Sequence, residues 1–296
     1  MSAVAGEMLF FEHETAARPA GGRLEGLFQK GVVTVSAVIL FVIVCCAVFA
    51  PWIAPHNPYT IHLLDPYSGP SRSYPFGQDS AGRDIVSRLI YGARLSLLGP
   101  TIVVGIALLA GVPLGFLAAY RGGFTDGIVS RLFDVLFAFP SLLLAVVIVA
   151  TFGASFITAA LAVAITYIPL MGRVVRSAAL VERSKPYVEE CRLQGYGAWR
   201  VLFVHMMPNM GRVLISQTTL YFAYGLLDLS ALSFLGLGAQ PPQIDWGGML
   251  ENANQGVFQS ATGVVFPAAA IVLLVVSLSF LGEWALDYGN RRVTWL

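Results

Sequence analysis

The chain has 296 residues, of which 56% are hydrophobic and only 12% are charged. Soluble domains carry about 25% charged residues, so this composition indicates a membrane protein. The formal net charge of +1 argues against a nucleic-acid partner held by a basic surface. The three cysteines, Cys45, Cys46 and Cys191, lack the spacing of a metal site or a disulfide framework, and we expect them to be packing residues.

Six apolar runs are long enough to cross a bilayer, which takes about 20 helical residues for about 30 Å of hydrocarbon. The first run follows an acid-containing polar segment and is longer than a signal-peptide core, so we expect it to be a retained span. The fourth run is the shortest. We therefore expect an all-α polytopic membrane protein with six transmembrane helices, at residues 31–54, 95–119, 132–151, 154–171, 213–235 and 263–284.

The distribution of basic residues predicts the orientation. Six spans put both termini on the same side, and cytoplasmic segments carry an excess of Lys and Arg. With the N-terminus in the cytoplasm, 14 of the 18 basic residues lie inside. Both termini and the loop after the fourth span are therefore expected to be cytoplasmic. The expected segments are a cytoplasmic N-terminal segment, the first helix with its outer loop, the transmembrane core with its central loop at 183–211, and a cytoplasmic tail, at residues 1–30, 31–94, 95–284 and 285–296.

Glycine and proline mark places of close packing and bending. Gly111 and Gly115 in the second span have the spacing that lets two helix backbones approach closely. Pro113, Pro140 and Pro169 fall in or beside spans and are expected to kink or end them. For any one of these residues, ordinary membrane packing is the favoured explanation, and close contact or bending around a transport path is the alternative.

Two outer segments are polar and turn-rich. In residues 55–91 the helical pattern begins after Asp84, and we expect its first turns to form an interfacial face before the second span. Residues 236–262 contain Trp246, a residue type enriched at membrane interfaces. Either segment docks an extracytoplasmic partner or merely connects spans. The candidate docking residues are Arg83, Asp84, Asp245 and Trp246.

Catalytic chemistry has no support in the sequence. A phosphate-binding P-loop needs Gly-Lys-Ser or Gly-Lys-Thr, but Lys30 follows Gln29 and Lys185 follows Ser184, and these are the only lysines. ATP hydrolysis is therefore expected in a separate chain. The four histidines are scattered, and a GxSxG nucleophile motif does not occur. We expect no catalytic residue, metal or bound cofactor in this chain.

The run at residues 187–209, YVEECRLQGYGAWRVLFVHMMPN, is a polar interruption between two long apolar segments. Pro186 suits the first turn of a helix, and Glu189 and Glu190 would lie near its positive end. Gly195 and Gly197 are expected to end this helix after about nine residues, which is too short to be stable alone. Anchoring to the protein's own spans is expected from Trp199, Val201, Leu202 and Phe203, before Pro208 and Gly211 break the chain.

This loop suits contact with a partner protein, but a helix lying on the membrane surface is the alternative. Surface helices are usually basic, so the two acidic residues disfavour that alternative. The loop resembles the EAA loop of ABC-importer permeases, with Glu189, Gly195 and Pro208 at the family's spacing. It departs from that pattern at Glu190 and Cys191, which replace two alanines, and also at His205 and Met207.

The resemblance extends over roughly residues 31–284. The segments GQDSAGRDIVSRLIYGARLSLL, FDVLFAFPSLLLA and ALSFLGLGAQPP are similar to the C-type permease of dipeptide, oligopeptide and nickel importers. This likeness implies a type I importer permease fold in a bacterial inner membrane. It also implies a B-type permease partner, two ABC ATPase subunits that bind ATP and Mg, and an extracytoplasmic binding protein. The residues implied in ATPase coupling are Glu189, Glu190, Arg192, Gly195, Gly197 and Pro208.

Two carboxylates are candidates for the translocation path. Asp228 lies within the fifth expected span, where an ionisable residue is costly and is a functional candidate by default. It would either meet a peptide's ammonium group or pair with a helix of the B-type partner. Asp134, in the FDVLFAFP segment, is the second candidate.

The leading hypothesis is thus that the chain is the translocation subunit of a peptide importer, which separate ATPases drive through contacts with the central loop. The same machinery serves nickel, glutathione and antimicrobial peptides, so these remain open as substrates. An ion-gradient-driven secondary transporter is the alternative of another class, but it would show internal repeats and several buried charges, and the sequence shows neither. A membrane enzyme would need a set of catalytic residues, for which the sequence gives no support.

Overall fold

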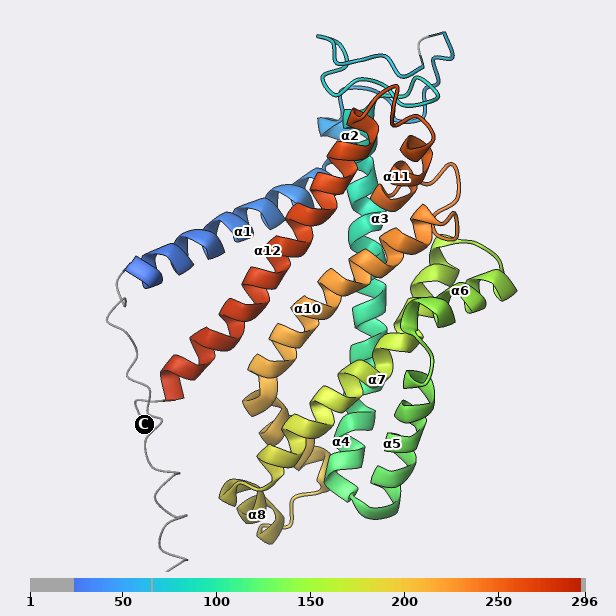
Figure 1. Ribbon diagram of the computed structural model, residues 1–296. Helices are drawn as coiled ribbons and strands as arrows, with labels where there is room; N and C mark the ends of the chain where they lie inside the picture. Colours follow the sequence, from blue (N-terminus) through green and yellow to red (C-terminus); the bar gives the residue numbers. More distant parts are fainter. Residues whose placement is uncertain (1–23, 65, 294–296) are drawn as a thin grey trace, which may run out of the picture.

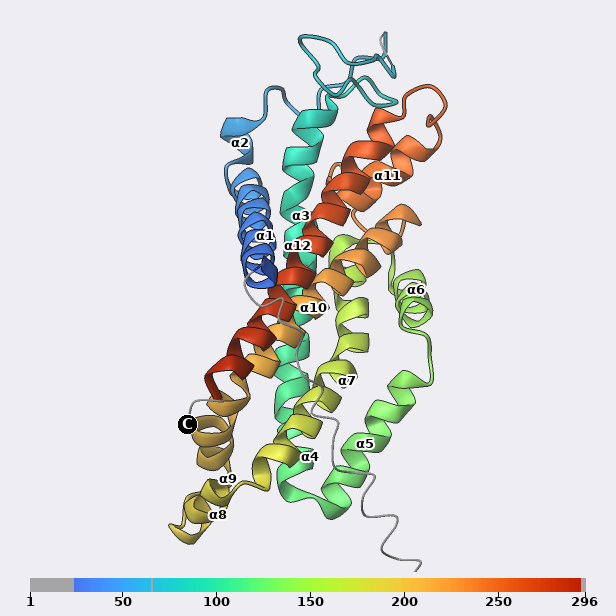
Figure 2. The same cartoon turned by 60° about the vertical axis from the view of Figure 1, so that its left-hand side comes forward.

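The computed structural model describes residues 24–64 and 66–293, so most of the expected N-terminal segment and the end of the tail lie outside the described residues. The regular secondary structure of the described residues is helical, apart from one isolated β-bridge between Gln78 and Asp84. Its helices form an elongated bundle from which α1 diverges (Figures 1 and 2). They are α1 Leu24–Val48, α2 Ala50–Ile53, α3 Ile85–Ile106, α4 Val112–Arg121, α5 Gly123–Phe137, α6 Ser141–Phe152, α7 Phe156–Arg183, α8 Pro186–Leu193, α9 Ala198–Arg200, α10 Met207–Phe234, α11 Trp246–Asn254 and α12 Thr262–Val293, with π-helical turns η1 Ala107–Gly111 and η2 Val201–Met206.

The expectation of an all-α polytopic membrane protein is confirmed for the described chain. Four helical stretches are long and apolar enough to cross a membrane, and the bent pair of α5 and α6 makes up to five. The expected fifth span lies inside α10, which has 28 residues but is not among those stretches. The four stretches are Gly31–Val48, Ile85–Arg121, Phe156–Arg183 and Thr262–Leu286.

The second span begins ten residues earlier than expected. The carboxylate of Asp84 caps α3 by accepting hydrogen bonds from the backbone N–H groups of Val86 and Ser87. Such a cap satisfies donors that have no partner in the first helical turn. Ile85 is 1% exposed. The expected interfacial face is therefore wrong at Ile85, because the first turn of α3 is buried and continuous with the span.

Two prolines follow π-helical turns instead of ending helices. Pro113 comes two residues after η1, and Pro208 comes two residues after η2. A proline has no N–H to donate and its ring crowds the carbonyl four residues earlier. A π-turn shifts the hydrogen-bond register, so the helix continues through the proline. The expected break at Pro208 and Gly211 is therefore wrong: α9, η2 and α10 run on from Ala198 to Phe234.

Close helix packing occurs where the glycine spacing predicts it. A Cβ on Gly111 would lie 2.7 Å from the carbonyl oxygen of Ile168, and one on Gly115 would overlap the carbonyl oxygen of Gly172. Both contacts are with the backbone of α7. The absence of side chains at these positions lets η1 and α4 contact α7. Pro169 lies inside α7, which extends to Arg183, well beyond the expected end of the fourth span.

The expected third span is not straight. At Pro140 the chain turns by 79° between α5 and α6. The α5 segment is fastened to α7 by Arg176, which donates to both carboxylate oxygens of Asp126 at 2.5 and 2.7 Å. The expectation that Pro140 kinks or ends a helix is confirmed.

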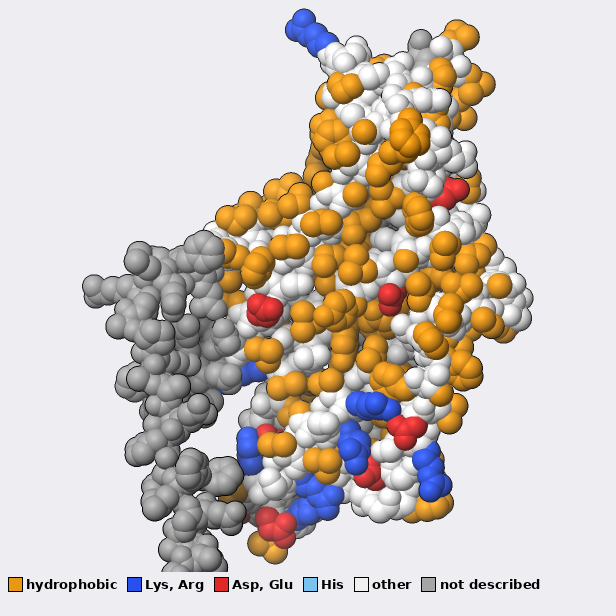
Figure 3. Space-filling view, in the orientation of Figure 1, with side chains coloured by type: hydrophobic (Ala, Val, Ile, Leu, Met, Phe, Trp, Pro, Cys, Tyr) orange, Lys and Arg blue, Asp and Glu red, His pale blue; other side chains and the backbone are white. Residues whose placement is uncertain are grey.

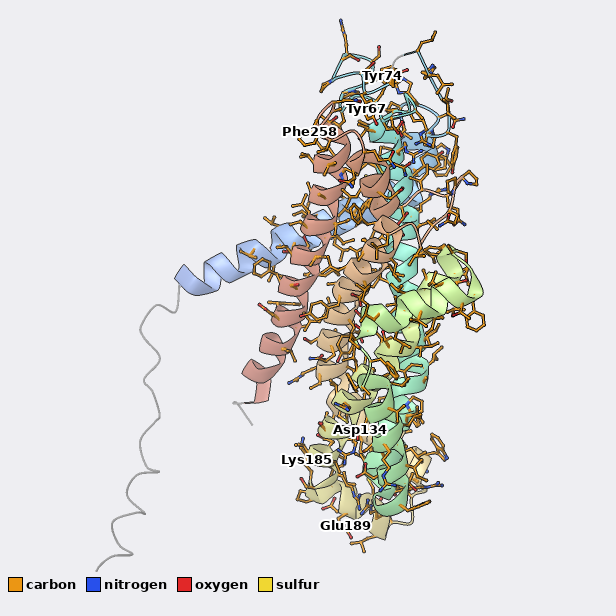
Figure 4. The ribbon with its side chains drawn as sticks, turned by 45° about the vertical axis from the view of Figure 1, so that its right-hand side comes forward. Tyr67, Tyr74, Asp134, Lys185, Glu189 and Phe258 are labelled. Atoms are coloured by element: carbon orange, nitrogen blue, oxygen red, sulfur yellow. The ribbon has the colours of Figure 1, made fainter. Side chains whose placement is uncertain are left out.

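The two ends of the bundle differ in chemistry. Lys and Arg side chains gather at the end that carries α8, while the middle of the face in Figure 3 is largely apolar. Lys185 and Glu189 lie at that end, and Tyr67 and Tyr74 lie at the opposite end (Figure 4). The polar central loop is therefore separated from the outer segments by the length of the bundle.

Candidate functional site

A buried acid fixes the turn between α7 and α8. Glu182 is 5% exposed, and its carboxylate accepts a hydrogen bond from the Tyr187 hydroxyl at 2.8 Å. The Lys185 ammonium lies 2.7 Å from the same carboxylate and neutralises it. Burial raises the pKa of Tyr187 to about 12, so the hydroxyl keeps its proton. Glu182 was not among the residues predicted to matter, although its place beside a Ser-Lys-Pro turn was a usable signal.

The inner face of α8 is docked on the protein's own core. Val188 is fully buried and Cys191 is 9% exposed, and both join the cluster that contains Val201 and Leu202. The guanidinium of Arg192 lies 5.0 Å from the centre of the Tyr120 ring. This docking supplies the stability that an eight-residue helix lacks alone. The expected anchoring by Val201 and Leu202 is thus confirmed.

The outer face of α8 is exposed and combines charge with apolar surface. The Glu189 side chain is 67% exposed, and its carboxylate lies 3.8 Å from the guanidinium of Arg192, which is a long distance for an ion pair. Glu190 is also exposed, whereas Cys191 occupies the buried position. The expected anchoring role of Trp199 is wrong, because this side chain is 65% exposed. Leu193, 81% exposed, was missed by the sequence reasoning, because an isolated apolar residue carries no periodic signal.

Gly195 ends α8 as expected, in a Schellman motif. Its φ is +78°, a left-handed conformation that favours glycine. The N–H of Gly195 donates to the carbonyl of Arg192, and the N–H of Tyr196 donates to the carbonyl of Cys191. Gly197 has φ −64° and is the N-cap residue that precedes α9. The expectation that Gly197 helps to end α8 is therefore wrong.

The two path candidates each have a partner in the same chain. Asp228 on α10 accepts a hydrogen bond of 2.9 Å from the hydroxyl of Tyr167 on α7. Asp134 on α5 is 66% exposed and lies 2.6 Å from Arg173 on α7, whose guanidinium also covers the Phe137 ring at 3.8 Å. Asp228 and Asp134 thus pair with residues in the middle part of α7, six positions apart, and each carboxylate has its own partner there. Tyr167 and Arg173 were missed, because pairing partners 61 and 39 residues away leave no local pattern.

Three of the four docking candidates on the outer segments are buried. Asp84 caps α3, and its side chain is 1% exposed. Asp245 caps α11 by accepting from the N–H of Gly248, and burial raises the pKa of its carboxyl. Trp246 is 2% exposed, and its indole N–H donates to the carbonyl of Leu89. Their side chains hold the outer segments against α3 and present almost no surface to a partner, so their docking role stays a prediction, as does the interfacial placing of Trp246. Arg83, 20% exposed, is the candidate that reaches the surface.

The described residues contain no cluster of three His, Cys, Asp or Glu side chains that could hold a metal ion. The central loop instead has the features of a protein-docking site: a rigid turn, an anchored inner face and an exposed acidic and apolar outer face. Such a surface offers complementary charge together with apolar contact area.

The chain matches known transporter components along most of its length. Residues 111–295 match the family described as "Binding-protein-dependent transport system inner membrane component". Residues 26–70 match the N-terminal transmembrane domain of oligopeptide transport permease C. Among solved structures, the MetNI methionine ABC transporter in inward-facing conformations superposes with a TM-score of 0.57 at 16% identity, over 68% of this chain and 95% of the matched chain. That superposition shows the ABC importer permease fold.

Several curated relatives are similar over most of both chains. The dipeptide transport system permease protein DppC of Escherichia coli strain K12 is 44% identical over 88% of each chain. The di/tripeptide transport system permease protein DppC of Pseudomonas aeruginosa is 41% identical over 84% of each chain. The glutathione transport system permease protein GsiD of Pectobacterium atrosepticum is 35% identical, over 88% of this chain and 86% of the relative. The chain belongs to the family of binding-protein-dependent transport inner membrane components, in which it is a permease subunit of the oligopeptide permease C type.

Proposed function

We propose that this chain is the translocation subunit of an ATP-driven importer of dipeptides or oligopeptides, and that α8 couples it to the ATPases. The observation that carries the coupling role is the two-faced α8: Val188 and Cys191 are buried in the chain's own core, while Glu189 and Leu193 are exposed. A helix fixed on one side transmits movement of a partner on the other side directly into α7 and α10. The names of the dipeptide-transport relatives support the substrate class.

The proposed topology has six spans with both termini in the cytoplasm. The spans are α1, α3 to α4, the bent pair α5 and α6, α7, α10 and α12. A 28-residue helix such as α10 is about 42 Å long, enough to cross the hydrocarbon core. The gathering of Lys and Arg at the α8 end supports the cytoplasmic placing of that end. The segment boundaries at residues 30, 94 and 284, and the central loop at 183–211, belong to this proposal.

The proposed assembly contains a B-type permease, two ATPase subunits and an extracytoplasmic binding protein. ATP and Mg are bound by the ATPase subunits. An ATPase cleft would receive α8, with a basic group close to Glu189 and an apolar surface against Leu193 and Trp199. Outward-facing apolar side chains on α5, of which Phe124 is 85% and Ile128 is 52% exposed, support a lipid or permease neighbour on that side.

Within this importer, Asp228 and Asp134 remain the proposed path residues, each poised by its partner on α7. The family's permeases differ in cargo, as the glutathione-transport relative illustrates. Glutathione, nickel and antimicrobial peptides are therefore alternative substrates of the same machinery. Binding measurements with the cognate binding protein distinguish them, because selection largely resides in that protein.

The coupling role is tested in proteoliposomes that contain the complete importer. Glu189→Lys and Gly195→Asp should leave the subunit assembled but abolish peptide uptake while ATP hydrolysis continues. Glu283→Lys makes the same charge change at an exposed position on α12 and serves as the control. Wild-type uptake by correctly assembled Glu189→Lys and Gly195→Asp variants would refute the coupling role of α8.

A further inference from the structure

The end of the bundle opposite α8 contains a cleft to which no ligand has been assigned above. Its volume is about 690 Å³, and it lies between the segment before α3, the loop after α10 and α11. Pockets that hold small ligands have volumes of about 300–1,000 Å³. Polar and charged side chains contribute to its lining, among them Arg83, Arg88, Gln240, Asp245, Glu251 and Asn252.

One part of the lining carries two arginines that share a single carboxylate. Arg83 Nε lies 2.7 Å from Asp79 Oδ2, while Arg88 Nε lies 3.4 Å from the same oxygen. The other oxygen of Asp79 accepts from the backbone N–H groups of Ala81 and Arg83. The carboxylate is therefore committed mainly to Arg83 and its turn. Two positive charges against one negative charge leave an excess of positive charge here.

Arg88 has donors to spare. Its side chain is 7% exposed, and its guanidinium makes one contact to Asp79 and one hydrogen bond to the carbonyl of Pro58, both at 3.4 Å. A guanidinium has five N–H donors in a planar fork that suits a carboxylate. Arg83 and Arg88 line the cleft, whereas Asp79 is not part of its lining. The arginine part of the cleft thus suits an incoming carboxylate.

Another part of the lining is acidic. Glu251 on α11 lines the cleft and forms no salt bridge with any other described residue. Asp245 also lines it, but its carboxylate is occupied in capping α11. Glu251 is therefore the carboxylate available to an incoming cation. Apolar surface from Pro241, Ile244 and Met249 completes the lining.

We propose that this cleft is a transient binding site for a short zwitterionic peptide, with Arg83 and Arg88 holding its C-terminal carboxylate and Glu251 holding its N-terminal ammonium. The observation that supports this proposal is that a single cleft of ligand size presents positive charge, negative charge and apolar surface. An acidic loop of the binding protein would match only the arginines. This inference rests on the proposed function as a peptide importer, and it adds a peptide site on the permease itself, distinct from the site on the binding protein.

The test measures binding of L-alanyl-L-alanine to the permease pair in nanodiscs without the binding protein, by saturation-transfer NMR titration. The same titration uses the C-terminal amide and the N-acetyl derivative. Arg83→Gln should raise the Kd of the free dipeptide at least tenfold and leave that of the amide unchanged. Glu251→Gln should likewise raise the Kd of the free dipeptide at least tenfold. It should leave the Kd of the N-acetyl derivative, which has no ammonium group, unchanged. Arg72→Gln removes an exposed arginine outside the cleft and is the matched control.

Arg83 is chosen over Arg88 because its side chain is less buried, so its loss threatens folding less. Three results would overturn the inference: no dipeptide binding, equal affinity for all three ligands, or variants that weaken only capture of the binding protein. The last would make the cleft a protein-docking surface. Intact ATP-driven dipeptide uptake by an importer whose permease pair binds no dipeptide would refute the site and leave the proposed function standing. A wild-type importer that transports no peptide would refute the proposed function.

Discussion

Gly195 and Gly197 offer a matched pair for testing how α8 is held. A Cβ added at either position would have no other group within 4 Å, so a methyl group there meets open space. They differ in backbone conformation: Gly195 has φ +78°, and Gly197 has φ −64°. Replacing each by alanine therefore isolates the backbone contribution.

The magnitudes follow from these dihedrals. Alanine in the left-handed region costs about 1–2 kcal/mol relative to glycine, so Gly195→Ala should destabilise the C-terminal turn of α8 by that amount. The turn should then open about 5 to 30 times more often. Gly197→Ala fits its backbone without strain and should be neutral or stabilising by about 0.4–1 kcal/mol, because the unfolded chain loses freedom.

Hydrogen exchange in nanodiscs measures both effects at the amides of Gly195 and Tyr196, whose N–H groups close the Schellman motif. Gly195→Ala should lower their protection about 5 to 30-fold, in line with the opening ratio. Gly197→Ala should leave it unchanged or raise it. A change of the same sign and size in both variants would refute the conclusion that the left-handed residue holds the end of α8.

Three further predictions concern the packing around this site. Burial raises the pKa of the Tyr187 hydroxyl to about 12 from the ordinary value of 10. Its contribution to the hydrogen-exchange protection of the α8 amides should therefore be constant below pH 10 and be lost between about pH 10 and 12. Tyr187→Phe should lack this transition. Gly115→Ala should lower stability by about 1–3 kcal/mol in detergent unfolding, because α4 contacts the α7 backbone there, whereas Gly127→Ala, in open space on α5, should not. A double-mutant cycle on Arg176 and Asp126 should give a coupling energy of about 1 kcal/mol that falls with added salt, and zero coupling at low salt would contradict the ion pair as the tie between α5 and α7.

The candidate site was predictable where it depends on local chemistry. Pro186 at the start of α8 and Gly195 at its end act through the dihedrals of their own residues, so their types alone mark the helix. The inward-facing Val201 and Leu202 were recognisable as apolar residues beside a polar loop. Trp199 and Leu193 were not, because an exposed apolar side chain is a property of the assembled surface.

The prolines show the same division. Pro140 breaks a helix as its chemistry requires, but the 79° turn of α6 depends on what each side packs against. At Pro208 the local rule failed, because the π-turn of η2 restored the hydrogen bonding that a proline disrupts in an α-helix.

The sequence by itself determined that this is a helical membrane protein with a polar central loop, because hydropathy and turn chemistry act over a few neighbouring residues. It also predicted that a helix backbone approaches Gly115 closely, because a missing side chain leaves room there, but only the fold identified α7 as that neighbour. Only the tertiary structure decided that Trp246 is buried, that Asp228 pairs with Tyr167 and that Glu251 shares a cleft with Arg88. These contacts join residues far apart in the chain, and their energies depend on which surfaces the whole fold brings together.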